Sequence, residues 1–162
     1  MNDNDKQTRY FELRQEGERV IKGTALRYGD IADLYFGKER FTSGAFKWND
    51  VILNVQHQRT QPLARTNGGG LEIINDSKEL SIRATLPDTT LANDTLKLIQ
   101  GGVLRGLSIE FIPEEETKID GVNEIRAATL YGVGIVDTPA YPDSILREDL
   151  QLSDNKDWWA LC

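Results

Sequence analysis

The sequence predicts a mostly β protein with helical additions, that is, a β-rich α+β fold. Many short segments alternate apolar and polar residues or form compact apolar runs, and Gly, Pro and Asp turns separate them. Only one segment shows a long apolar stripe at helical spacing. With 162 residues and 39% hydrophobic residues, the chain suits one domain with a real core. About eight strands and one firm helix favour a mostly antiparallel barrel or sandwich.

Composition narrows the class of protein. The net charge is −7 and no basic stripe interleaves with aromatic residues, so we expect no nucleic-acid partner. No apolar run is long enough to span a membrane, and the N-terminus lacks the apolar core of a signal peptide. The single cysteine, Cys162, excludes an internal disulfide framework and suits a reducing cytoplasm.

Polarity at the two ends predicts the domain organisation. We expect a disordered N-terminal tail over residues 1–7, one folded domain over 8–147 and an acidic C-terminal tail over 148–162. The C-terminal tail carries Trp158-Trp159 near its end, a pair that we expect to dock or to bind something.

The first third of the chain predicts a hairpin followed by irregular structure. Thr8–Arg14 and Arg19–Tyr28 have strand character and are joined by a short segment with a glycine. For residues 31–50 we expect a loop with one short helix, anchored by Phe41 and Phe46.

The middle of the chain predicts further strands. Val51–Val55 is a compact apolar run, best interpreted as a buried strand that delivers His57 at its end. Leu63–Thr66 predicts a short strand, and Leu71–Asn75 with Glu79–Leu86 predicts a clear hairpin.

A helix and a strand follow. The helix is expected to start with Asp88 as its N-cap and to stop at Gly101-Gly102. It leads into a strand that carries Ser108 and Glu110 on one face, because strand side chains alternate between faces. The opposite face carries the apolar anchors Leu107, Ile109 and Phe111.

The last strand region follows an acidic segment. Residues 114–123 predict a loop around Asp120-Gly121, with its glutamates as a solvated tip. Residues 124–136 predict strand structure that ends at Asp137. Gly132 and Gly134 lie two apart on one face, which predicts the close approach of another element.

His57 and Ser108 are the candidate chemical groups. A serine hydroxyl is inert near neutral pH until a base removes its proton, and an imidazole is the usual base. Either residue alone also has an ordinary interpretation, as a surface histidine in a turn and a polar residue of an amphipathic strand. Because the chain has one histidine, a two-histidine mechanism and a multi-ligand zinc site are not expected. No metal or organic cofactor is implied.

Four motifs follow one another along the chain: ERFTSGAF, then VILNVQH with PLART, then LPDTTLANDTLKLIQGGVLRGLSIEF, and finally GIVDTPAYPDS. In this order they resemble the prohead (capsid-maturation) serine proteases of tailed phages, which are similar in fold to the herpesvirus assembly proteases. The resemblance covers roughly residues 8–147. It implies an antiparallel β-barrel of the herpesvirus-protease type, flanked by helices.

The resemblance also implies catalytic roles, with Ser108 as nucleophile and His57 as general base. Many members have Glu-Val-Ser in the closing strand, and that glutamate is a candidate third catalytic residue. This chain has Gly-Val-Gly over residues 132–134 instead. Glu110 is our first substitute, since it shares a face with Ser108, and Asp137 is the second; Glu110 as a plain solvent-facing residue stays open.

The oxyanion formed in such a reaction needs a donor. A backbone N–H or an arginine, Arg105 or Arg126, are the candidates in this sequence.

The function that the resemblance implies is a serine endopeptidase that matures a phage capsid. It would act inside the prohead in the host cytoplasm, on scaffold and capsid-protein extensions and on itself, with a homodimer possible by the herpesvirus comparison. The main alternative is a catalytically inert scaffold or shell-binding module with the same fold. A hydrolase of small esters is the weakest option, because the chain lacks the Gly-x-Ser-x-Gly elbow.

Overall fold

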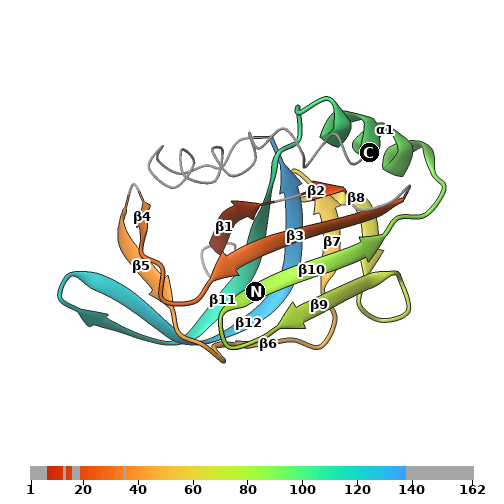
Figure 1. The fold of residues 1–162 in the computed structure, drawn as a ribbon. Helices are drawn as coiled ribbons and strands as arrows, with labels where there is room; N and C mark the ends of the chain where they lie inside the picture. The colour runs from red at the N-terminus through yellow and green to blue at the C-terminus, as the bar shows by residue number, and fades with distance from the viewer. Residues whose placement is uncertain (1–6, 13, 16–18, 35, 138–162) are drawn as a thin grey trace.

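The computed structural model describes residues 7–12, 14–15, 19–34 and 36–137, with side chains from residue 19 onward (Figure 1). The expected tails, residues 1–7 and 148–162, lie outside the described residues except for Gln7, which begins the first strand. The tryptophan pair near the C-terminus also lies outside them.

The described residues form twelve strands and one helix. In chain order the elements of the first half are β1 (Gln7–Glu12), β2 (Arg14–Gln15), β3 (Val20–Arg27), β4 (Ala32–Leu34), β5 (Gly37–Phe41), β6 (Phe46–Lys47) and β7 (Ile52–Val55). Those of the second half are β8 (Gln58–Arg65), β9 (Leu71–Asn75), β10 (Glu79–Thr85), α1 (Thr90–Gln100), β11 (Gly106–Ile119) and β12 (Val122–Val136).

The strands make two sheets. The larger has the order β1-β11-β12-β5-β4, with β6 and β7 also paired to β12 and β8 paired to β7. The smaller has the order β2-β3-β10-β9. The prediction of a mostly β fold is confirmed, but the sheets are not closed into one barrel. The expected barrel of herpesvirus-protease type, flanked by helices, is therefore not confirmed, and α1 is the single helix of the described residues.

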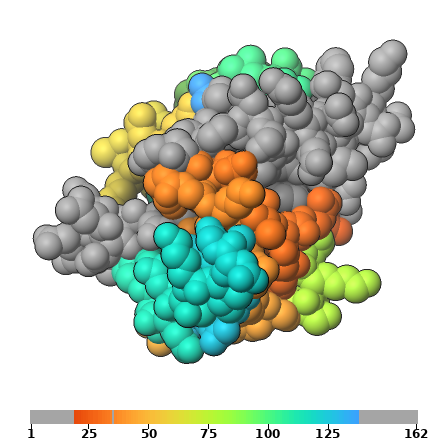
Figure 2. Space-filling model, turned by 90° about the vertical axis from the view of Figure 1, so that its left-hand side faces the viewer, coloured from red at the N-terminus to blue at the C-terminus, as the bar shows by residue number. Residues whose placement is uncertain are grey.

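The long strand β12 organises the larger sheet. One of its edges pairs antiparallel with β11, and the other pairs in parallel with β5, β6 and β7 in succession. The predicted loop over residues 114–123 is wrong, because β11 and β12 continue through it and turn at Asp120-Gly121. Figure 2 shows the end of this hairpin, in cyan, beside β4 and β5, in orange.

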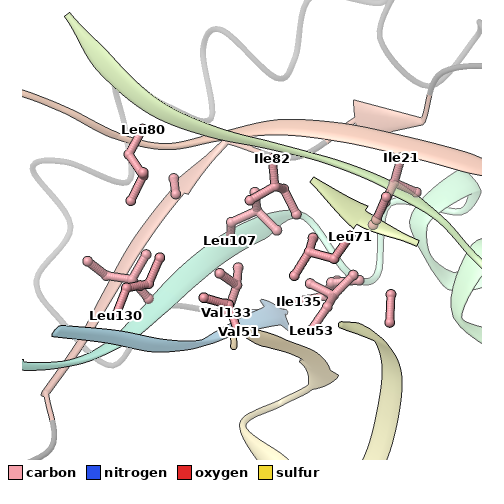
Figure 3. Packing of buried hydrophobic residues seen from close by; sticks show 14 of the residues in the cluster. Ile21, Val51, Leu53, Leu71, Leu80, Ile82, Leu107, Leu130, Val133 and Ile135 are labelled. Carbon is pink, nitrogen blue, oxygen red and sulfur yellow. The ribbon is translucent and has the colours of Figure 1, made fainter. Parts of the chain in front are cut away.

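The hydrophobic core lies between the two sheets (Figure 3). Ile21, Leu80 and Ile82 of the smaller sheet face inward, and none is measurably exposed. Leu107 and Ile135 of the larger sheet oppose them and are equally buried. Because this face of the larger sheet is sealed in the core, its polar residues must lie on the opposite face.

Helix α1 directly precedes β11 in the chain (Figure 1). Its N-cap is Thr89, whose Oγ1 accepts a hydrogen bond from the backbone N–H of Ala92 at 3.1 Å, so the expected cap at Asp88 is wrong by one residue. Its C-cap is Gly101, as the glycine pair predicts. With 11 residues, α1 is too short to cross a bilayer, and no other helix is found among the described residues.

The N-terminal third departs from the sequence prediction. The first predicted strand is divided, because β1 joins the larger sheet beside β11 and β2 joins the smaller sheet beside β3. Residues 31–50 contain the short strands β4, β5 and β6 in place of the expected loop and helix. The strands β5 and β6 pair with the distant strand β12, and β4 pairs with β5. Propensity alone does not specify strands that depend on a distant partner.

The hairpin of β7 and β8 is closed at its base by Asp50. The carboxylate accepts hydrogen bonds from the Arg65 guanidinium (2.9 Å from Nε), the Thr66 hydroxyl (3.0 Å) and the Asn67 backbone N–H (3.1 Å). The Thr66 hydroxyl in turn accepts from the backbone N–H of Val51 at 2.9 Å. These donors, led by Arg65, lower the pKa of Asp50 from 3.8 to about 2.

We predict that Asp50→Asn destabilises the protein at neutral pH and does so less as the pH falls. A carboxyl whose pKa is depressed by folding stabilises the fold above its ordinary value, 3.8, and loses that contribution toward pH 2. Urea unfolding at several pH values measures the difference from the native chain, which should close between about pH 4 and 2. Asp94→Asn, on the exposed side of α1, is the matched control. A difference that does not change with pH would contradict the assignment.

Candidate active site

Ser108 and Glu110 lie on the face of β11 that is turned away from the core. Leu107 and Ile109 alternate with them and have no measurable exposure, which settles the two faces of the strand. The Ser108 residue is 5% exposed and the Glu110 side chain is 13% exposed. A hydroxyl and a carboxylate therefore project side by side from a strand that the core holds in place.

The strand register places a glycine opposite each of them. Ser108 pairs with Gly134 and Glu110 pairs with Gly132 on the antiparallel neighbour β12. On the other side of β12, Gly134 pairs with Asn54 of the parallel strand β7. Residues directly opposed in a sheet share a face, so Ser108, Gly134 and Asn54 form one row across three strands. The glycine leaves the middle of that row without a side chain.

His57 lies in the turn between β7 and β8. Val55 pairs with Gln58, so Gln56 and His57 are the two central residues of a tight hairpin, and both have positive φ (54° and 58°). Positive φ at both positions defines the turn whose twist matches the strands, and it is uncommon for residues other than Gly, Asn and Asp. The sequence prediction of a histidine at the end of a buried strand is confirmed, with an immediate hairpin in place of a loop.

The imidazole lies over Gly134. A Cβ added to this glycine would stand 2.7 Å from Nδ1 and Cε1 of His57 and 3.1 Å from Nε2. Gly132 makes equivalent room for Glu110, since a Cβ there would stand 1.7 Å from Oε2 of the carboxylate. The close approach expected from this glycine pair is thus made by the side chains of His57 and Glu110.

One hydrogen bond joins the two side chains. Nδ1 of His57 lies 2.8 Å from Oε1 of Glu110. An ionised carboxylate only accepts, so Nδ1–H of the imidazole donates and Nε2 carries the free lone pair in the neutral ring. The His57 side chain is 25% exposed, so the pair is shielded but in reach of solvent. Glu110 therefore sets both the orientation and the tautomer of the ring.

Nε2 of His57 lies 3.1 Å from the Cβ position of Gly134, the strand partner of Ser108. Directly opposed Cβ atoms in a sheet are about 4.5–5.5 Å apart, so the ring lies over the residue next to Ser108 in the row. Among the described residues no hydrogen bond yet links the Ser108 hydroxyl to the ring. In enzymes without bound substrate such a contact is often long and tightens when substrate binds.

The other predicted residues have different places. Asp137 follows β12, and its backbone N–H donates to the Gln56 side chain at 3.2 Å, whereas the imidazole is bonded to Glu110. Arg105 lies just before β11, where its N–H donates to Val136 at 2.9 Å. Arg126 is ion-paired with Glu124 at 2.9 Å, roughly 20 Å along β12 from the site.

Sequence reasoning missed two neighbours of the histidine. Asn54 is 3% exposed, and its Oδ1 has no hydrogen-bond partner among the described residues. Gln56 bonds to the end of β12 through both its backbone and its side chain. The signal for Asn54 was present, because it is the one polar residue of the run Val51–Val55, at the position that alternation turns away from the core. Nothing in the sequence signals the bonds of Gln56.

Chemically, the arrangement combines the Ser108 hydroxyl, an imidazole over Gly134, the strand partner of Ser108, and a carboxylate on Nδ1 of that ring. A base of this kind can take the hydroxyl proton, and the carboxylate stabilises the imidazolium that forms. The set suits nucleophilic attack by serine on a carbonyl carbon.

Comparison with known proteins agrees with this chemistry. A family model described as caudovirus prohead serine protease matches residues 6–156. Among solved structures, the chain is similar to that of the bacteriophage T4 capsid assembly protease, gp21, with a TM-score of 0.51 and 12% sequence identity, over 84% of this chain and 100% of that one. At this identity the likeness concerns the fold. No curated protein matches the chain.

We predict that Gly134→Ala separates the imidazole from Glu110, because the new Cβ would lie 2.7 Å from the ring. Nitrogen-15 NMR checks this cleanly, since His57 is the single histidine and its Nδ1–H reports the bond to the carboxylate. We expect that signal to be lost while the fold is kept, with a loss in stability below about 3 kcal/mol. Gly101→Ala, whose Cβ would meet only a carbonyl oxygen at 3.3 Å, is the control and should leave the ring unchanged. An unaltered imidazole spectrum in Gly134→Ala would refute the packing argument.

Proposed function

Since the chain belongs to the family of caudovirus prohead serine proteases, we propose that it is a serine endopeptidase that acts during capsid maturation, with Ser108 as nucleophile and His57 as general base. The observation that carries the proposal is the position of the imidazole over Gly134, the strand partner of Ser108, with its far nitrogen on Glu110. The proposed protease domain spans residues 8–147.

The reaction follows from the three groups. Oγ of Ser108 attacks the carbonyl carbon of the scissile peptide bond while its proton moves to Nε2 of His57. The imidazolium is stabilised by the carboxylate of Glu110 through Nδ1–H, and it then gives the proton to the leaving amine as the C–N bond breaks. Water, activated by the same imidazole, hydrolyses the ester left on Ser108. No metal is needed for any of these steps.

Glu110 takes the place of the glutamate that resembling proteases carry in the closing strand. The two strands are neighbours, and Glu110 is the register partner of Gly132, where that glutamate is expected. The Glu110 carboxylate occupies space that any side chain at position 132 would need, since a Cβ there would lie 1.7 Å from Oε2. The two placements of the carboxylate are therefore mutually exclusive, and the glycine supports a role for Glu110.

For the oxyanion we propose a backbone N–H at the start of β11 or the guanidinium of Arg105. Arg105 precedes Ser108 by three residues, and its backbone is held by the hydrogen bond from its N–H to the carbonyl of Val136. Donors of this kind act best when they are fixed before the charge develops. The ion pair with Glu124 and the distance along β12 argue against Arg126.

The proposed substrates are the scaffold and capsid-protein extensions of an immature phage head, together with the protease's own tails. A protease of this type needs an extended, accessible chain, and the polar segments 1–7 and 148–162 of this sequence fit that need in composition. The proposed place of action is inside the prohead in the host cytoplasm, with a homodimer as the proposed assembly and no nucleic acid or membrane as partner.

An activity-based probe tests the nucleophile. We predict that a fluorophosphonate labels Ser108 in the native chain and that Ser108→Ala abolishes labelling. His57→Ala should slow it at least about 10⁴-fold, because the hydroxyl loses its base. Mass spectrometry of the labelled peptide identifies the residue.

The alternative function, an inert scaffold or shell-binding module with the same fold, makes the opposite prediction. Native chain that stays unlabelled, both alone and after assembly with capsid and scaffold proteins, would favour that module. Labelling at a serine other than Ser108 would refute the assigned nucleophile and leave the family assignment intact.

Exchanging the two strand partners tests the carboxylate. Glu110→Gly should slow labelling about 10⁴-fold, in line with the loss of the group that orients a catalytic histidine. In the double variant Glu110→Gly/Gly132→Glu a carboxylate returns from the neighbouring strand, and we predict recovery of more than about tenfold. Glu110→Gly/Gly132→Gln is the matched control and should recover nothing. Equal rates in the two double variants would remove the carboxylate from the mechanism.

Self-cleavage is tested by storage. We predict that the native chain shortens at one or both tails over time and that Ser108→Ala stays intact. Intact-mass spectrometry of both proteins, purified and stored in parallel, gives the cleavage positions. Equal shortening of the two would assign the cuts to a contaminating protease.

A further inference from the structure

The turn that carries His57 has residues that are poorly suited to its backbone. The same chain makes the other described two-residue turn of this type, between β11 and β12, with Asp120 and Gly121 at φ 50° and 80°. Asp-Gly is a preferred pair for such turns, whereas Gln-His is not. Strained backbone of this kind persists only where surrounding contacts impose it, and it concentrates at functional sites.

Gln56 makes the contacts that hold this turn. Its backbone N–H donates to the carbonyl of Ile135 at 2.9 Å. Its side-chain Oε1 accepts from the backbone N–H of Asp137 at 3.2 Å. Ile135 directly follows Gly134, the residue beneath the imidazole, so Gln56 is bonded to β12 next to the position that the His57 ring contacts.

The side-chain bond also continues the sheet. The parallel ladder between β7 and β12 ends with Val55 opposite Ile135. At the next step the backbone of β7 has already turned into the hairpin, and the amide of Gln56 satisfies the N–H of Asp137 in place of a strand carbonyl. A glutamine has the length to do this from a left-handed residue, while the shorter residues that such turns prefer would not reach the N–H of Asp137.

We propose that Gln56 is a positioning residue for the active site. Its two bonds fix the turn on β12, so that the imidazole stays over Gly134 between Glu110 and Ser108. The strained backbone of Gln56 is kept because Asn, Asp or Gly, which would adopt this backbone more easily, could not make the side-chain bond to Asp137. This inference deepens the proposed protease function and rests on it for its kinetic consequence, though not for its structural one.

The substitution Gln56→Asn separates the effect of the left-handed backbone from the effect of the side-chain bond to Asp137. Asparagine tolerates the left-handed backbone better, keeps the backbone bond to Ile135 and lacks the reach to Asp137. We expect the stability in urea to equal or exceed that of the native chain. The rate of fluorophosphonate labelling at Ser108 should fall about 10- to 100-fold, as misplacement of a catalytic group by about 1 Å does. Gln56→Glu, with the same length and an acceptor oxygen, should restore most of the rate.

A second readout is independent of activity. In the full-length Ser108→Ala protein, the nitrogen-15 spectrum of the lone imidazole should show Nδ1–H bonded to Glu110, and Gln56→Asn should weaken that signal. If the native chain does not label, the proposed function fails, and this spectral comparison alone decides the role of Gln56. A native-like spectrum in Gln56→Asn, or a slower rate explained by lost stability, overturns the inference. So does failure of Gln56→Glu to restore the signal.

Discussion

The hydrogen bond between Nδ1 of His57 and Oε1 of Glu110, 2.8 Å long, is the interaction on which the site depends. It forms because two glycines of one strand, Gly132 and Gly134, leave room for the carboxylate and the ring. Any side chain at either position would occupy the space of one partner. The remaining ring nitrogen, Nε2, lies 3.1 Å from the Cβ position of Gly134, the strand partner of Ser108.

The rest of the fold supports this contact by bringing two distant segments to the strand β12. The antiparallel partner β11 supplies the hydroxyl and the carboxylate, while the parallel partner β7 ends in the turn that supplies the imidazole. The hairpin of β7 and β8 that carries this turn is held at its base by Asp50 and at its tip by Gln56. The core seals the opposite face of the same strands, so the positions of the three groups are tied to the packing of the two sheets.

The Glu110 carboxylate lies above its own strand partner. Gly132 and Glu110 are opposed across two strands, and the carboxylate fills space that any side chain at position 132 would need. A motif search that requires an acidic residue in the closing strand would miss this arrangement. The neighbouring Asn54 is buried, and its Oδ1 has no hydrogen-bond partner within the part of the chain that the structure describes, a second feature of the same row that a motif does not capture.

The sequence alone determined whatever depends on local pattern. Alternation around Ser108 predicted the face that it shares with Glu110, and an apolar run placed His57 at a strand end. The pair Gly132 and Gly134 predicted a close contact. Only the tertiary structure decided which strands are neighbours, because register and sheet order depend on contacts between residues far apart in the chain. Tertiary structure therefore decided which short strands pair with β12 and that the sheets stay open in place of a barrel. It also decided the hydrogen bond from His57 to Glu110 and the one between Gln56 and the end of β12.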